Sequence, residues 1–451
     1  MGENIQLNDI VLLFDSYTTD SKDLHESFKR AGYDCPAVVI EEDGFLPDGV
    51  LSVYGYFLGA YEKGENIPGK PRYFNQIKVP EYWEISGTNS SGKVNDLSKE
   101  RGRIFYAEPK HKRLVRVVDW LDERGIVRSS DHYNRFGALY ARTIFNAKGQ
   151  KVNKTYFSAA GQEIIMENYV TGDLILNDGK DVLFFRTKTD FVLYFLKKTG
   201  YDKKRLFFNS LSTPFFVSQR LDRTEKQDIL FWQELVSDEI PGNMRIILDG
   251  RETRTGQIMV QKRKSYHRLL ELGAQPEIVH KLGFVYPFQK ENEGRPEALI
   301  CTNSDNIEQC HKLVTSLPQI HFHIAALTEM SSKLMSMGTF DNVTLYPGVK
   351  LSILDELFMK CDFYFDVNHE AEIVSAVRKA FLHNHLIFAF KETLHNKDYV
   401  SDERIYASND VNQMIADVKA VVAEPKILQE YLTLQHQAAL AESVDAYTML
   451  K

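Results

Sequence analysis

Apolar and polar positions in residues 362–390 alternate in a pattern that predicts a strand–helix–strand unit. The apolar run 363–367 is typical of a strand buried on both faces, and Leu386–Phe390 repeats that pattern. Between these runs apolar residues recur at helical spacing, namely Ile373, Val374, Val377, Ala380 and Phe381. Asn384 can end this helix because asparagine tolerates the left-handed conformation. Ligands bind at the carboxyl ends of parallel strands, which predicts a site near residues 368–370.

The second half of the chain continues this alternation of strands and helices. Further strands are predicted at 298–301, 321–325 and 343–345, and 425–450 is predicted as one long amphipathic helix. Such alternation is typical of a parallel sheet with right-handed crossovers. We therefore predict a C-terminal Rossmann-like domain over 282–424 and a terminal helix over 425–451.

The first half has the same pattern at its two ends. Ile10–Phe14 is predicted as a buried strand, followed by a helix that Asp20 or Ser21 caps and that Gly32 closes. After residue 179, strands are predicted at 182–185, 206–209, 229–232 and 244–248. We predict that 1–50 and 179–281 form one N-terminal Rossmann-like domain.

Residues 51–178 have a different pattern, with short runs rich in Tyr, Phe, Arg and Val between turn residues. The first run, 53–58, is predicted as a strand. The turn from Asn146 to Gly149 predicts a hairpin, because Gly149 can take a positive φ. We predict an inserted antiparallel β domain. Two interpretations of its aromatic and basic strands stay open: the aromatics cover the sheet's own core, or one face docks a protein partner.

Charge and cysteine usage narrow the class of protein. A net charge of −7 gives no electrostatic indication of a nucleic-acid partner. The four cysteines show no Cys-x-x-Cys spacing, which is typical of a cytosolic protein. We expect no signal peptide and no membrane span. His321 and His323 alternate on a predicted strand, but no acidic or cysteine neighbour in the sequence completes a metal site, so we expect no metal and no cofactor.

The 362–390 unit resembles the donor-sugar subsite of retaining glycosyltransferases of the GT-B architecture. In that family the turn and helix carry two glutamates that bind the sugar and ribose of a nucleotide sugar, followed by a Gly-x-Pro. Here Ala371 and Lys379 stand at the glutamate positions, Asn384 at the glycine and Leu386 at the proline. The strand 298–301 also lacks the Gly-Arg turn and lysine that bind the diphosphate, and a helix cap by Ser304 or Asp305 is the alternative interpretation of that turn. The resemblance thus implies a GT-B scaffold whose donor chemistry is lost.

Three further segments narrow the resemblance. They are Ile-Leu-Phe-Trp-Gln-Glu at 229–234, Asp-Glu-Ile-Pro-Gly-Asn-Met at 238–244 and Tyr-Ala-Arg-Thr-Ile-Phe at 140–145. Over essentially its full length, the chain resembles the GtfB-type glycosyltransferase-stabilising family of the bacterial accessory Sec system. This implies an α/β, GT-B-like fold: two facing Rossmann-like domains, an antiparallel β-sheet domain inserted in the first, and a C-terminal helix crossing back to the first domain.

The same resemblance implies a non-catalytic subunit. Its partner would be a catalytic homologue that transfers N-acetylglucosamine from UDP-GlcNAc to Ser/Thr of serine-rich repeat adhesins, in a hetero-oligomer of two plus two subunits. The complex would be cytoplasmic or peripheral on the cytoplasmic face of the membrane. Two alternatives stay open: an active retaining GT-B glycosyltransferase with an atypical donor site, and a nucleotide-sugar epimerase-like enzyme.

Residues at the carboxyl ends of the predicted strands are candidates for an acceptor-peptide cleft. In the first domain they are Asp15, Ser16, Tyr17, Asn209, Ser210, Trp232, Gln233 and Glu234. In the second they are Thr302, Asn303, Asn368 and His369. We expect Trp232 to be the main contact, since a flat ring packs well on an extended peptide. The alternative is that several of these side chains only cap helices.

Overall fold

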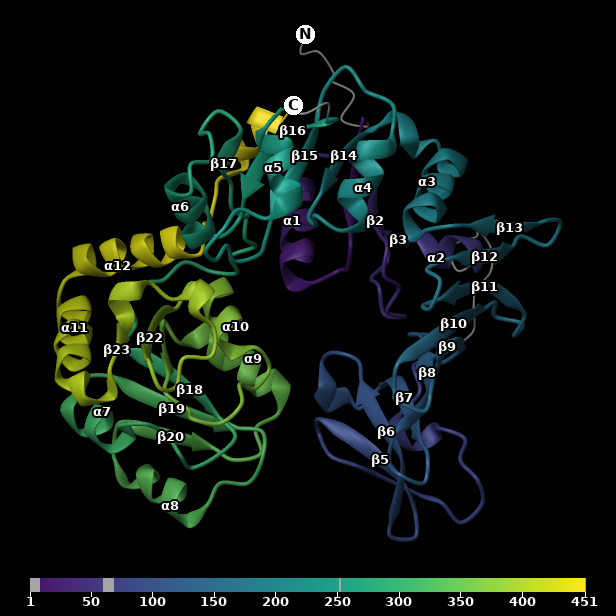
Figure 1. Cartoon of the computed structure of the whole chain (residues 1–451). Helices are drawn as coiled ribbons and strands as arrows, with labels where there is room; N and C mark the ends of the chain where they lie inside the picture. Colours follow the sequence, from purple (N-terminus) through teal and green to yellow (C-terminus); the bar gives the residue numbers. More distant parts are fainter. Residues whose placement is uncertain (1–8, 60–68, 251–252, 451) are drawn as a thin grey trace. The chain divides into compact units, whose positions relative to one another are not determined.

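The computed structural model describes residues 9–59, 69–250 and 253–450. It divides into two compact units (Figure 1). The first comprises the described residues up to 260 together with 264–280 and 450, and the second comprises 261–263 and 281–449.

Among the described residues of the first unit, seven strands form one sheet. In spatial order they are β17 (Val279–Lys281), β16 (Thr255–Val260), β15 (Asp228–Trp232), β14 (Arg205–Phe208), β1 (Ile10–Phe14), β2 (Ala37–Val39) and β3 (Val50–Ser52). The pairs from β16 through β3 are parallel. Every residue of β1, β14 and β15 is buried, as expected for parallel strands covered on both faces.

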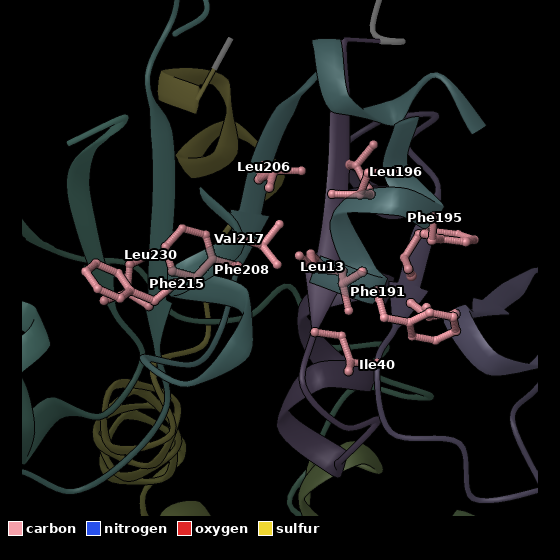
Figure 2. Packing of buried hydrophobic residues seen from close by; sticks show 14 of the residues in the cluster. Leu13, Ile40, Phe191, Phe195, Leu196, Leu206, Phe208, Phe215, Val217 and Leu230 are labelled. Atoms are coloured by element: carbon pink, nitrogen blue, oxygen red, sulfur yellow. The ribbon is translucent and has the colours of Figure 1, made fainter. Parts of the chain in front are cut away.

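Helices supply the apolar side chains that cover this sheet. They are α1 (Thr19–Arg30), α3 (Lys188–Thr199), α4 (Thr213–Arg220), α5 (Gly242–Leu248) and α6 (Arg263–Glu271). Figure 2 shows Phe191 and Phe195 of α3 beside Leu13 of β1, and Phe215 of α4 beside Leu230 of β15. The predicted strand at 244–248 was wrong, because these residues belong to α5.

Thr18 caps α1, instead of the predicted Asp20 or Ser21. Its hydroxyl oxygen accepts a hydrogen bond from the Ser21 amide at 3.2 Å, which satisfies a free first-turn N–H, and the helix begins at Thr19, before both predicted caps. Gly32 follows the helix with φ +79°, as its predicted role requires.

Ten strands in the described part of the first unit form a second, antiparallel sheet. Its order follows the chain: β4 (Glu84–Gly87), β5 (Ser91–Asp96), β6 (Lys99–Tyr106), β7 (Val115–Leu121), β8 (Val127–Tyr133), β9 (Leu139–Phe145), β10 (Lys151–Phe157), β11 (Glu163–Asn168), β12 (Leu174–Asn177) and β13 (Val182–Phe185). The predicted hairpin joins β9 and β10, and Gly149 has φ +75°. Strand β13 pairs antiparallel with β12, so its prediction as a strand of the parallel sheet was wrong.

The two sheets of the first unit share one hydrophobic cluster, to which β9–β12 contribute. The predicted strand at 53–58 is instead the helix α2 (Val53–Phe57), capped by the Ser52 hydroxyl. Its Tyr54 ring stacks on Tyr156 of β10, with centroids 4.5 Å apart. The prediction failed because the aromatics of α2 pack between the two sheets rather than along one of them.

Residues 281–449, all of them described, contain a six-stranded parallel sheet. Its order is β20 (Val343–Tyr346), β19 (His321–Ala326), β18 (Glu297–Thr302), β21 (Phe363–Asp366), β22 (Leu386–Phe390) and β23 (Ile405–Tyr406). Its longer helices are α7 (Cys310–Ser316), α9 (Leu351–Lys360), α10 (Ala376–Leu382), α11 (Val411–Ala423) and α12 (Pro425–Ala438). This sheet confirms the strand–helix–strand unit predicted at 362–390.

Two predicted helix limits in the second unit were wrong. The terminal helix does not reach 450, because α12 ends at Ala438 and Val444–Leu450 forms a separate 3-10 helix. Neither Ser304 nor Asp305 caps a helix, since α7 begins at Cys310 after Gln309 in the left-handed conformation. Asn384 does adopt the expected left-handed conformation, with φ 57°.

Candidate functional site

A polar pocket lies in the first unit where β1, β14 and β15 end. It has a volume of 390 Å³ and is lined by Asp15, Ser16, Thr18, Thr19, Asp20, Asn209, Ser210, Gln233 and Glu234. Six of these residues belong to the predicted acceptor set. Parallel strands align their carboxyl ends at one edge of a sheet, which explains why residues so distant in sequence meet here.

Hydrogen bonds among the pocket residues fix their orientation. Asn209 accepts from the Asp15 amide at 3.3 Å and donates to Gln233 Oε1 and Ser21 Oγ, both at 2.9 Å. Ser210 Oγ donates to Asp15 Oδ2 at 3.4 Å. Burial, followed by the nearby Glu41 charge, raises the pKa of Asp15. The exposed Glu234 carboxylate adds negative charge, so the pocket favours hydroxyl and amide donors.

Two members of the predicted first-domain set lie outside this pocket. Trp232 is only 4% exposed and belongs to the hydrophobic core, so its ring offers no surface to a peptide. This overturns its expected role as the main contact. Tyr17 turns its hydroxyl to His25 Nδ1 at 2.9 Å. Sequence alone places both residues at strand ends, but the direction of each ring depends on the layers that cover the sheet.

The predicted residues of the second unit are also close together. Thr302 Oγ1 donates to Asn368 Oδ1 at 2.8 Å, and Asn368 Nδ2 donates to Asn303 Oδ1 at 3.4 Å. His369 Nε2 lies 2.6 Å from Glu308 Oε2. Thr302 and Asn368 are buried, so they hold the ends of β18 and β21 together more than they present a surface.

At the positions that correspond to the donor-sugar subsite, Lys379 and Leu386 make contacts within the fold. Lys379 pairs with Asp355 and its ammonium lies 4.8 Å from the Phe358 ring centroid. Leu386 is buried in β22, whereas Ala371 is exposed. Glu372, the nearest acid to Ala371 on the helix side, accepts from the Val377 amide at 2.8 Å. Its carboxylate therefore satisfies a backbone N–H in the first turn of α10.

The described residues include neither a metal-binding cluster nor a helix that could span a membrane. These contain no group of three His, Cys, Asp or Glu side chains able to hold a metal ion. His321 bonds Thr344, and His323 bonds Glu297, a neighbour that the linear sequence does not reveal. Within the same residues, every helix is too short or too polar to cross a bilayer.

Four family models match consecutive parts of the chain: the GtfB N-terminal domain at 11–57, middle domain at 83–186 and third domain at 188–272, and the GftB/GlyA-F C-terminal domain at 298–435. A relative in Streptococcus agalactiae is 45% identical over 408 residues, covering 90% of this chain and 91% of the relative. Another in Streptococcus gordonii is 42% identical, covering 97% of each chain. Both are named UDP-N-acetylglucosamine--peptide N-acetylglucosaminyltransferase stabilizing protein GtfB. The chain belongs to the GtfB family.

Solved structures place this GtfB-family chain among GT-B folds. It matches a chain in the crystal structure of the GtfA/B complex bound to UDP and GlcNAc, with TM-score 0.90, 41% identity and 98% of each chain covered. It also matches TarM, with TM-score 0.51 and 11% identity over 98% of this chain and 97% of that one, which bears on the fold alone. The α/β, GT-B-like fold class is therefore confirmed.

One polar cluster of this GtfB-family chain escaped the sequence analysis. At the end of β21, Asp366 binds His395, whose Nδ1 lies 2.5 Å from Asp366 Oδ1. His395 Nε2 lies 2.6 Å from the Glu370 carbonyl oxygen. The hydrogen bond to Asp366 raises the pKa of His395 to about 9. The available signal was a histidine following β22, the strand next to the one that Asp366 ends, but sequence alone does not bring the two together.

Proposed function

We propose that this chain is the non-catalytic, stabilising subunit of a protein O-glycosyltransferase complex. The observation that carries the proposal is its similarity over 98% of its length to a chain of the GtfA/B complex bound to UDP and GlcNAc. In the proposed complex, a catalytic homologue transfers N-acetylglucosamine from UDP-GlcNAc to Ser/Thr of serine-rich repeat adhesins. This chain stabilises that homologue and helps to bind the acceptor.

The contacts at the degenerate donor positions support a non-catalytic role. A nucleotide sugar needs hydrogen-bond acceptors for its hydroxyls and cations for its diphosphate. Ala371 offers no side-chain acceptor, and Lys379 is engaged by Asp355 and Phe358. Glu372 is committed to the start of α10. The donor would therefore lose its strong, charge-assisted contacts.

The strand-end residues of both units support acceptor recognition. The described residues lining the polar pocket include no lysine or arginine. Hydroxyl, amide and carboxylate groups suit the hydroxyls and backbone amides of a serine-rich peptide better than a diphosphate. We assign acceptor binding to Asp15, Ser16, Asn209, Ser210, Gln233 and Glu234 of the pocket. In the second unit we assign acceptor contacts to the exposed Asn303 and His369, which the buried Thr302 and Asn368 hold in place at the strand ends.

We assign partner docking to the inserted domain, which also includes β13. Residues 1–50 and the part of 179–281 that follows β13 form the N-terminal Rossmann-like domain, and 282–424 forms its C-terminal counterpart. The exposed aromatic and basic side chains of the ten-stranded sheet support this assignment. The complex contains two copies of each subunit and serves the accessory Sec system. It works in the cytoplasm, including the cytoplasmic face of the membrane, where free cysteines such as Cys301 stay reduced.

Reconstitution with the catalytic homologue tests the proposal. The two chains should co-purify, and sugar transfer to a Ser-rich peptide should be slower or lost when this chain is omitted. If the isolated chain transfers the sugar by itself, the alternative of an active GT-B glycosyltransferase replaces the proposal. If it converts free UDP-GlcNAc to an epimer, the epimerase-like alternative replaces it.

A further inference from the structure

A second pocket of the first unit lies between the loop after β2, the helix α2 and two hairpins of the antiparallel sheet. Its volume is 440 Å³. Aromatic residues from three of these segments line it, namely Phe57, Phe136, Tyr140 and Phe157. Among the described lining residues, Glu42 supplies the one carboxylate. The pocket therefore combines ring surfaces with a negatively charged group.

Within the part of the chain that the structure describes, the Glu42 carboxylate has hydrogen-bond donors but no ion-pair partner. Its Oε1 accepts from the Gly44 amide at 2.8 Å, and the Ser52 hydroxyl also bonds to it. Burial raises the pKa of Glu42, which is the expected cost of a carboxylate removed from water. None of the ion pairs among the described residues includes Glu42, so its charge lacks a direct counterion. A cation entering the pocket would compensate this charge.

Neither of two cations near Glu42, Arg135 and Lys154, forms an ion pair with it. Arg135, which lines the pocket, pairs with Asp48, and its guanidinium lies 4.9 Å from the Phe136 ring centroid. Lys154 is buried, lies 4.7 Å from the Tyr156 ring centroid and interacts electrostatically with three carboxylates, those of Glu41, Glu167 and Glu42, so Glu42 has only a share of its charge. Since Arg135 already covers the Phe136 ring, Phe57, Tyr140 and Phe157 are the lining rings left for an incoming cation.

We propose that this pocket is a socket for one cationic side chain, an arginine or lysine, of a protein that docks on the first unit. The faces of aromatic rings attract cations, and the attraction grows when the cation leaves water. The Glu42 carboxylate provides a charge-assisted hydrogen bond at the same place. The acidic loop that forms this wall, with Glu41, Glu42 and Asp43, adds a complementary field.

Binding of two matched probes to the full chain tests the socket without any partner. N-acetyl-arginine amide and N-acetyl-citrulline amide have nearly the same shape, but only the first is charged. Titration followed by NMR should show the arginine probe binding about tenfold more tightly, because only it gains the cation–π and charge-assisted contacts. Glu42→Gln keeps the side-chain shape and should remove most of this preference.

Substitutions on the wall provide the control. Ala138 lines the pocket, so Ala138→Trp should fill it and abolish binding of the arginine probe. Ala147→Trp, in the exposed hairpin turn between β9 and β10, should leave binding unchanged. Equal affinity for the two probes in the unmodified chain overturns the proposal, as does an unaltered preference in a folded Glu42→Gln variant. Failure of the transferase to co-purify would reject the proposed function and leave this probe experiment unaffected.

Discussion

Trp232 and Glu234 are two residues apart, yet truncation of each should affect a different property. Trp232→Ala should lower the free energy of unfolding by about 3–5 kcal/mol, because it leaves a cavity in the core. Glu234→Ala should leave stability unchanged and weaken binding of an unglycosylated Ser-rich peptide by about 1–3 kcal/mol, as for a contact hot spot. Urea unfolding and calorimetry measure the two effects. Asp238→Ala, at an exposed acid outside the pocket, is the control and should leave the peptide affinity unchanged. An unchanged peptide affinity in Glu234→Ala would show that the pocket does not bind the acceptor.

The ion pair between His395 and Asp366 should make stability depend on pH. The folded-state pKa of His395 is raised to about 9, above its ordinary value of 6.5. The ion pair therefore makes its full contribution to the stability of the folded state below about pH 6.5, and this contribution is lost as the pH rises through about 9. His395→Gln should cost about 1–3 kcal/mol near pH 6 and much less near pH 10.

Urea unfolding of both proteins at the two pH values measures this difference for His395. The exposed His311→Gln is the matched control and should show no such dependence. An equal loss of stability at both pH values in His395→Gln would show that Asp366 does not hold a charged imidazole.

At the scale of the elements, the edge strand β13 offers a direct test of partner docking. Val182 is 71% and Phe184 61% exposed, and β13 ends the ten-stranded sheet. Phe184→Lys should prevent co-elution with the transferase, because an exposed aromatic residue is a common hot spot and a lysine discourages edge pairing. Val444→Lys, at an exposed apolar position of the second unit, is the control and should not prevent co-elution. Co-elution of a correctly folded Phe184→Lys variant would exclude this edge as the docking surface.

Elements were predictable where local pattern and burial agree. The strands β1, β21 and β22 are wholly buried, and their apolar runs, which only Asp366 at the end of β21 interrupts, indicate this directly. The helix α2 was not predictable in this way, since its aromatic sequence also suits a strand. What selects the helix is the Ser52 cap and the packing of Tyr54 on Tyr156, about a hundred residues away.

For the whole molecule, the loss of donor contacts predicts that the isolated chain does not bind UDP-GlcNAc. Calorimetry should show no binding at sub-millimolar donor, and no hydrolysis should follow, because charge-assisted contacts at Ala371 and Lys379 are missing. The catalytic homologue, titrated in the same way, is the positive control. A clear sub-millimolar isotherm for this chain would restore the active-enzyme alternative.

The sequence by itself determined the class of fold and most of the polar pocket. Asp15, Asn209 and Gln233 follow buried strands, and the carboxyl ends of parallel strands meet at one edge whatever the details of packing. The tertiary structure alone decided that Trp232 faces the core, that β13 joins the antiparallel sheet and that His395 meets Asp366. Periodicity is encoded by near neighbours, whereas the covering layer, the strand partner and the counterion of a charge come from residues distant in the chain.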